Sequence, residues 1–203
     1  MKTLIYTAMG LLCAVAVVAD PIDSKVIHNY SQFGLGYNYV EADDVNGHGV
    51  IGSVSVELSN FLIGAGGNYI WFDEFDAEGW SAGGFAGYIL RLMENHINII
   101  PRVGLKYNEV SVDLGPFEDA DTGVTTLEPG ITLSYAINNH ISLNGGYTYV
   151  GEISSDNIQF DSVHTFSVGT RIAITENLGL NLDALFQEEQ GFSGATAILS
   201  WHF

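Results

Sequence analysis

The chain contains few basic residues and only one cysteine. Six Lys and Arg stand against 24 Asp and Glu among 203 residues, which gives a net charge of -18 at pH 7. Nucleic acid is therefore excluded as a partner, because contacts with phosphate need the opposite charge. The single cysteine, Cys13, cannot form an intramolecular disulfide or a site with several thiolate ligands. At 47% hydrophobic and 15% charged residues, the chain is also too apolar for a disordered acidic protein.

The first 19 residues have the pattern of a secretory signal peptide. Lys2 precedes a short apolar run, and small residues come just before the expected cleavage site after Ala19. A retained membrane anchor is the alternative, but the run is short and no stop-transfer flank follows it. A lipoprotein site would need a small residue before Cys13, and Leu12 is not small. We therefore expect residues 1–19 to be removed.

Beyond the leader, the sequence lacks both a helical period and an apolar run long enough to cross a bilayer as a helix. Large apolar side chains instead alternate with small or polar ones, which is the pattern of strands. We count ten such segments, including an ambiguous Gly-rich one, and each has about the ~9–11 residues that a tilted strand needs to cross a bilayer. Their apolar positions begin at Phe33, Val50, Phe61, Trp80, Ile97, Leu127, Ile141, Phe166, Leu178 and Ala195.

The connections between these segments alternate between short and long. The tight turns are Ser59-Asn60, Arg91 to Asn95, Asn138-Asn139 and Thr175 to Asn177. The longer loops are Glu41 to Gly49, Asp73 to Gly79, Asp113 to Gly123, Gly151 to Asp161 and Glu188 to Gly191. Strict alternation places all the long loops at one end of an up-and-down barrel and both termini at the other.

The two faces of the strands predict a barrel in lipid rather than in water. The polar positions are mostly Gly, Ser, Thr and Asn, which are too small to coat a water-facing barrel but fit a narrow lumen. Aromatic residues gather near both strand ends, as two interfacial girdles require. We therefore predict an all-β fold, an up-and-down antiparallel transmembrane β-barrel over residues 29–203 after a short periplasmic segment, residues 20–28. Ten strands are favoured and eight are the alternative.

The last strand carries a resemblance to a known group. Residues 195–203 read Ala-Thr-Ala-Ile-Leu-Ser-Trp-His-Phe, so Leu199, Trp201 and the terminal Phe203 alternate along one face. With the leader, this resembles the small outer-membrane β-barrel proteins of Gram-negative bacteria, the broad porin-family group with OmpA-like and opacity-type barrels. The resemblance implies this fold, location in the cell outer membrane, and recognition of Trp201 and Phe203 by the barrel-assembly machinery. It identifies no subfamily.

Strand parity places six charged side chains in the lumen. Across the turn at 175–177, Arg171 and Asp183 are opposed or diagonal neighbours, and Lys106 and Glu128 stand in a similar relation across a loop. We therefore predict ion pairs in the lumen. They could gate a pore, or they could simply satisfy charges that must pair when buried. The six residues are Glu57, Arg102, Lys106, Glu128, Arg171 and Asp183.

The long loops are acidic and contain no Lys or Arg, which predicts a negative potential at the mouth of the barrel. Divalent cations could bind there and bridge to lipopolysaccharide, although no loop has the spaced ladder of a calcium loop. A solvated acidic rim is the simpler interpretation. The acids are Glu41, Asp43, Asp44, Asp73, Glu74, Asp76, Glu78, Asp113, Glu118, Asp119, Asp121, Glu152, Asp156, Asp161, Glu188 and Glu189.

Catalysis has two weak candidates. A protease would use His48 and His164 with the acids at 73–76, and a lipid A hydrolase would use His164 with Ser162, but neither arrangement is specific. Four further histidines fall at the turn end, where spacing supports no metal site and they are better interpreted as interfacial or turn residues. They are His28, His96, His140 and His202.

The sequence thus predicts a non-enzymatic outer-membrane barrel without a cofactor. Its expected role is structural or interactive, with a small cation-selective pore as an additional activity. An outer-membrane hydrolase is the alternative. The expected partners are outer-membrane lipid and lipopolysaccharide, the barrel-assembly machinery and divalent cations at the acidic loops.

Overall fold

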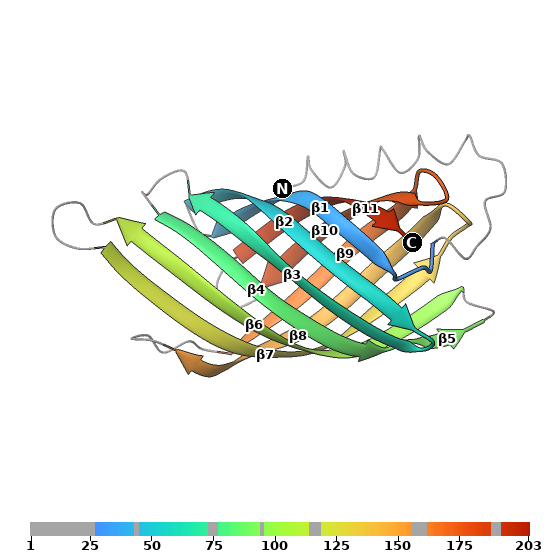
Figure 1. The fold of residues 1–203 in the computed structure, drawn as a ribbon, viewed down its shortest axis with the longest axis horizontal. Coiled ribbons are helices and arrows are strands. Elements are labelled where there is room, and N and C mark those ends of the chain that lie inside the picture. Colours follow the sequence, from blue (N-terminus) through green and yellow to red (C-terminus); the bar gives the residue numbers. More distant parts are fainter. Residues whose placement is uncertain are drawn as a thin grey trace.

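The computed structural model describes residues 27–42, 45–72, 77–93, 96–113, 119–155, 162–187 and 192–203, and its strands form one closed antiparallel barrel (Figure 1). Consecutive strands are neighbours throughout, and β1 closes the barrel against β11. No helix long and apolar enough to cross a membrane occurs in the described part of the chain. The strands are β1 (Gln32–Ala42), β2 (Val45–Leu58), β3 (Phe61–Phe72), β4 (Ala77–Tyr88), β5 (Leu90–Leu92), β6 (Ile97–Asp113), β7 (Asp119–Ala136), β8 (Ile141–Ser155), β9 (Val163–Ala173), β10 (Leu178–Gln187) and β11 (Phe192–His202).

The wall of the barrel has ten strands, because β4 and β5 are two parts of one strand. Both pair with β6 in a single register, in which Gly87 lies opposite Arg102 and Leu90 lies opposite Ile99. Ile89 separates them, and its N–H donates to the carbonyl oxygen of Asn60 at 2.7 Å. The prediction of ten strands rather than eight is confirmed, and the ambiguous Gly-rich segment is the fourth of them.

Tight turns lie at one end of the barrel, as predicted. The turn between β2 and β3 is Ser59 and Asn60, and Ser59 adopts a positive φ of 60°. At the other end the strands run further than expected. Val45 pairs with Ala42, and Asp119 pairs with Asp113, so much of two predicted loops is paired strand. Once a hairpin is in register, each further residue pair adds backbone hydrogen bonds.

Strand lengths differ around the barrel. β6, β7 and β8 have 17, 18 and 15 residues, whereas β9, β10 and β11 have 11, 10 and 11. In Figure 1 β6 and β7 extend farthest toward the loop end, on the left of the view. These strands are longer than the ~9–11 residues that cross a bilayer.

Bulky apolar side chains cover the outside of the barrel, and small or polar ones face the lumen. Phe61 is 61% exposed and Val168 is 56% exposed, which would be unfavourable in water and is expected in lipid. The aromatic girdles are also outward, with Phe61 against Tyr88 at the turn end and Trp80 against Tyr107 at the loop end. The barrel therefore presents to its surroundings the surface of a transmembrane barrel of the outer-membrane type.

Leu199 and Trp201 lie on the outer face of β11, and Phe203 follows that strand; all three are exposed. Recognition of these residues by the assembly machinery stays a prediction. The leader, residues 1–19, lies outside the described residues, as does most of the predicted periplasmic segment. Its last two residues, Ile27 and His28, are described and buried.

We expect Gly36→Ala to lower the free energy of unfolding by about 1–3 kcal/mol, the usual effect of overpacking. A Cβ on Gly36 would overlap the carbonyl oxygen of Ala197 and lie 2.8 Å from the Cα of Ile198, both on the backbone of β11. Gly52→Ala is the matched control, because its Cβ would meet only a side-chain atom of Leu35 at 3.5 Å. Urea unfolding in detergent measures both. Equal stability of the two variants would contradict the close contact between β1 and β11.

Candidate functional site

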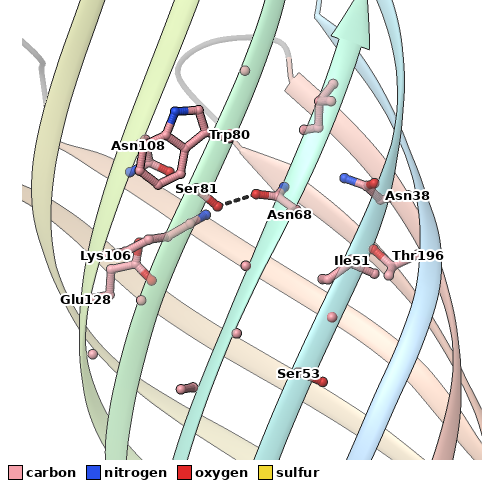
Figure 2. A pocket seen from close by; sticks show the side chains of 18 of the residues that line it. Asn38, Ile51, Ser53, Asn68, Trp80, Ser81, Lys106, Asn108, Glu128 and Thr196 are labelled. Atoms are coloured by element: carbon pink, nitrogen blue, oxygen red, sulfur yellow. Dashed lines mark hydrogen bonds between the residues drawn. The ribbon is translucent and has the colours of Figure 1, made fainter.

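The lumen is divided into a cavity toward the loop end and a filled region at the turn end. The cavity has a volume of about 460 Å³. Figure 2 shows its wall of short polar side chains, including Asn38, Asn68, Ser81 and Thr196, with Lys106 pointing toward Ser81. Ser81 also contacts Asn68 across the β3 and β4 strands. The Oδ1 atom of Asn38 is buried there without a hydrogen-bond partner in the described part of the chain.

Two of the predicted lumen cations, Arg102 and Lys106, line this cavity together with Glu128. Glu128 pairs with Gly104, which places it diagonally from both Arg102 and Lys106. It accepts a hydrogen bond from Thr126 at 3.1 Å, and among the described residues it forms no ion pair. Arg102 lies 5.8 Å above the Phe85 ring and donates to Thr148 at 3.3 Å. The predicted Lys106–Glu128 ion pair is therefore absent: Glu128 accepts from Thr126, and Lys106 points toward Ser81.

The predicted ion pair between Arg171 and Asp183 is also not formed, although both side chains are in the lumen as predicted. Arg171 pairs with Asn181 in the register of β9 and β10, and Asp183 pairs with Gly169, so the two charges are diagonal. The carboxylate of Asp183 lies over Gly169, where a Cβ would overlap it. Arg171 instead donates from Nε to Asn181 Oδ1 at 3.0 Å.

The second partner of Arg171 is the segment before β1. Residues 27–31, which we call the N-terminal plug, have no strand structure and fold into the turn end of the lumen. Arg171 donates from Nη1 to the carbonyl oxygen of Ile27 at 3.2 Å, and its guanidinium lies 5.3 Å from the Tyr30 ring centre. Ile27 is only 1% exposed. Arg171, which was predicted to pair with a carboxylate of the barrel wall, thus binds the plug instead.

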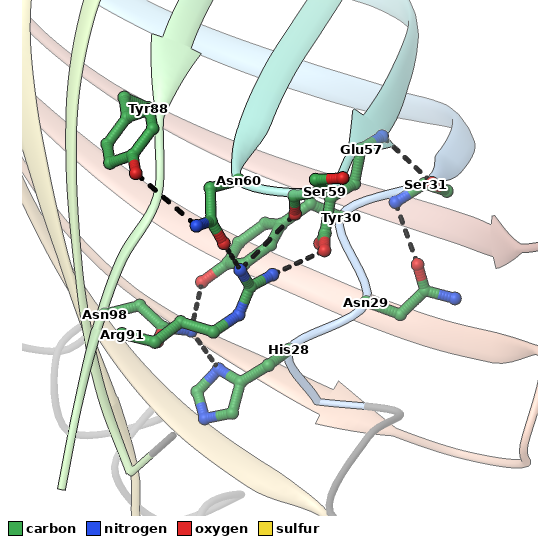
Figure 3. A network of polar contacts seen from close by, with 10 residues as sticks. All are labelled: His28, Asn29, Tyr30, Ser31, Glu57, Ser59, Asn60, Tyr88, Arg91 and Asn98. Atoms are coloured by element: carbon green, nitrogen blue, oxygen red, sulfur yellow. Dashed lines mark hydrogen bonds and ion pairs between the residues drawn. The ribbon is translucent and has the colours of Figure 1, made fainter. Parts of the chain in front are cut away.

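Three other strands hold the plug as well, and Figure 3 shows the contacts that one of them makes through Asn98. Ser55 of β2 donates to the carbonyl oxygen of Tyr30 at 2.5 Å, and His202 of β11 lies 3.2 Å from the carbonyl oxygen of Asn29. Asn98 of β6 donates to the Tyr30 hydroxyl at 3.0 Å. Beneath these bonds, Tyr30 belongs to a small apolar cluster. Its other members are Leu62, Ile89 and Ile100, with Phe85 packed against them.

One ion pair is present in the part of the chain that the structure describes, between Glu57 and Arg91. Glu57 was predicted to face the lumen, but Arg91 was placed in a turn. Its strand, β5, instead carries it to the lumen side, where it also donates to Asn60 Oδ1 at 2.6 Å (Figure 3). All four described cations therefore lie on the lumen side. They are Arg91, Arg102, Lys106 and Arg171.

The sequence does not predict the plug, because residues 20–28 are expected to be a short periplasmic segment. The available signal was an aromatic residue and a histidine, Tyr30 and His28, immediately before the first strand. His28 and His202 are thus lumen residues, 7% and 2% exposed, rather than interfacial ones. No group of three or more His, Cys, Asp or Glu that could hold a metal occurs among the described residues.

The histidines proposed for catalysis do not converge. His48 on β2 lies beside Tyr37 and Tyr39 of β1, and His164 on β9 stacks on Tyr147 of β8 with a 2.7 Å contact to its hydroxyl. Each histidine therefore belongs to a separate outward-facing aromatic cluster. Ser162 is exposed just before β9, and the acids at 73–76 lie outside the described residues.

Comparisons with known proteins agree on the fold. No family model and no curated protein matches the chain. Among solved structures, the β domain of the Bordetella autotransporter BrkA aligns at a TM-score of 0.55 and 9% identity, covering 85% of this chain and 99% of that one. The NanC porin aligns at 0.49 and 9%, covering 84% and 100%, and Neisserial surface protein A at 0.45 and 15%, covering 85% and 95%. At such identities, the likeness concerns the fold alone.

We expect Glu57→Gln to lower the free energy of unfolding by about 1.5–3 kcal/mol, the usual contribution of a hydrogen bond to a charged group. The change leaves Arg91, whose side chain is 24% exposed, without its carboxylate partner. Glu176→Gln at an exposed turn is the control and should be neutral. Urea unfolding in detergent measures both. No difference between them would show that the pair adds nothing to stability.

Proposed function

We propose that the protein is a small pore of the outer membrane of a Gram-negative bacterium, closed at the turn end by the N-terminal plug. One observation carries the proposal: a five-residue segment outside the strands, residues 27–31, packs inside the turn end of the lumen. Above this segment is the polar cavity of about 460 Å³. A segment held by hydrogen bonds can leave the lumen without breaking the barrel wall, whereas wall side chains cannot.

Three features support the outer membrane as the location. The outside of the barrel is apolar and girdled by aromatics, the tight turns are all at one end, and the expected leader would direct export. Lipopolysaccharide is then the lipid around the loop end. The exposed Leu199, Trp201 and Phe203 would be read by the barrel-assembly machinery during insertion. The proposal assigns the protein no enzymatic activity.

The acidic mouth would give the pore a preference for cations. In the lumen the four described cations are accompanied by the carboxylates of Glu57, Glu128 and Asp183, so the lumen wall discriminates little between cations and anions. The loop acids carry no such balance, because the loops contain no Lys or Arg. A negative mouth concentrates cations, divalent ones included, and repels anions. Ten of the sixteen loop acids lie outside the described residues, so the proposal here rests on sequence.

Arg171→Ala should conduct in a planar bilayer where the unchanged protein is closed. The variant loses the bond to Ile27 and the contact with Tyr30, and hydrogen bonds to charged groups contribute about 1.5–3 kcal/mol each, so the open fraction should rise ten- to a hundredfold. Lys106→Ala is the control, because it removes a lumen cation remote from the plug. Silence of both variants, with folding shown by heat-dependent gel mobility, would rule out the pore.

The current through Arg171→Ala should be carried mainly by cations. In a KCl gradient, the reversal potential should lie toward the value for K⁺. Adding Glu41→Gln and Glu152→Gln at the loop end should lower the K⁺ over Cl⁻ permeability ratio by about sevenfold, because a potential change of about one kT acts on the two ions in opposite directions. Adding Glu176→Gln at the turn end is the comparison. An anion-selective current would contradict the role assigned to the mouth.

A further inference from the structure

His28 lies at the point where the plug meets the lumen wall. It is 7% exposed, and its Nδ1 is 2.8 Å from the amide nitrogen of Asn98. Because an amide nitrogen only donates, Nδ1 accepts this bond and the imidazole is neutral. Asn98 is 0% exposed and its amide nitrogen also donates to the Tyr30 hydroxyl at 3.0 Å, so one side chain joins two plug residues (Figure 3).

The surroundings of His28 disfavour a positive charge. Its Nε2 is buried and has no hydrogen-bond partner among the described residues. The two arginines that face it are both positive, and the carboxylate of Glu57 is paired with one of them, Arg91. The titratable and charged groups around His28 are Arg171 from β9, Arg91 from β5, His96 from the turn before β6, Tyr30 from the plug itself, Glu57 from β2 and His202 from β11.

We propose that His28 is a proton-operated lock, so that acidification releases the N-terminal plug and opens the pore. This inference rests on the proposed pore function. A proton from water on Nδ1 occupies the lone pair that accepts from Asn98, which turns an acceptor into a second donor. The same proton adds a third positive charge beside Arg91 and Arg171. Both effects weaken docking of the plug. Neither penalty remains once the plug is released, because water then solvates the protonated His28.

The direction of the pH dependence follows from the same environment. His28 precedes the first strand, and burial together with the charges of Arg171 and Arg91 lowers its pKa from 6.5 to about 4. The released plug therefore binds the proton more tightly than the docked one. The ratio of docked to released plug is therefore highest above pH 6.5. It falls by up to tenfold for each pH unit as the pH decreases from 6.5 toward 4.

Single-channel recording between pH 7.5 and 4.5 tests the lock. The unchanged protein should show an open fraction that rises at least tenfold on acidification. His28→Asn keeps an acceptor for Asn98 but cannot titrate, so its open fraction should not change with pH. Asn98→Asp offers a protonated His28 a carboxylate acceptor and should stay closed at pH 4.5. His140→Asn, in the turn at 137–140, should respond like the unchanged protein.

Thiol labelling gives a second readout that does not need conduction. In the chain without its leader, and hence without Cys13, the normalised rate at which Ile27→Cys reacts with a membrane-impermeant maleimide should be at least tenfold higher at pH 4.5 than at 7.5. Rates are taken relative to Glu176→Cys at an exposed turn, which corrects for the thiol's own pH dependence. Adding His28→Asn should remove the acceleration.

The outcomes separate the lock from the pore. If the unchanged protein stays closed and unlabelled at pH 4.5 while Arg171→Ala conducts at pH 7.5, the lock is wrong and the pore stands. If His28→Asn opens with acid like the unchanged protein, another group is responsible and the lock is wrong. If acid accelerates labelling but neither the unchanged protein nor Arg171→Ala conducts, the plug moves without a pore, and the proposed function fails.

Discussion

Closure of the β-ladder is the constraint on which the rest of this structure depends. Lipid offers no hydrogen-bond partner to a backbone N–H or C=O group, so a sheet can cross a membrane only when its first and last strands pair. Here β1 pairs with β11 over eleven residues. Closure fixes a narrow lumen, and bulky apolar side chains therefore face the lipid. Within the membrane, charged side chains can then be placed only in the lumen.

The use of charge in the lumen follows from that confinement. A buried guanidinium must find partners, and the described arginines find them in different ways. Arg91 takes the carboxylate of Glu57, Arg102 takes an aromatic face and a threonine, and Arg171 takes a wall amide and a carbonyl of the plug. Only the last joins the wall to a segment that is not part of it, and this contact is the one that release of the plug would have to break.

The sequence was sufficient to predict the strands of the barrel, but it did not predict the contacts inside the lumen. Alternation with period two identified the strands and their faces, because lipid acts on every residue of a wall strand. The pattern also placed Arg171 and Asp183 as neighbours, but it could not distinguish directly opposed from diagonal positions. In the structure they are diagonal, and Arg171 donates to the residue directly opposite, Asn181. Arg91 was missed because β5 extends past the expected start of a turn.

The plug was beyond pattern analysis for a different reason. Residues 27–31 have no periodicity, and their place depends on contacts with residues far along the chain, such as Asn98, Arg171 and His202. The same holds for His28, whose neutral form is set by Asn98 seventy positions away. A histidine before a strand is ordinary in a sequence, and only the folded lumen gives it two arginines as neighbours.

The unequal strand lengths make the rim of the barrel oblique. At about 3.3 Å per residue and a tilt of about 40°, the 18 residues of β7 rise roughly 45 Å, whereas the 10 residues of β10 rise roughly 25 Å, close to the height of the apolar band alone. The wall around β7 therefore projects beyond the lipid, whereas the wall around β10 ends near the headgroups. Solutes from the medium would meet the projecting wall first, while molecules that diffuse laterally along the membrane surface would reach the opening over the shorter strands.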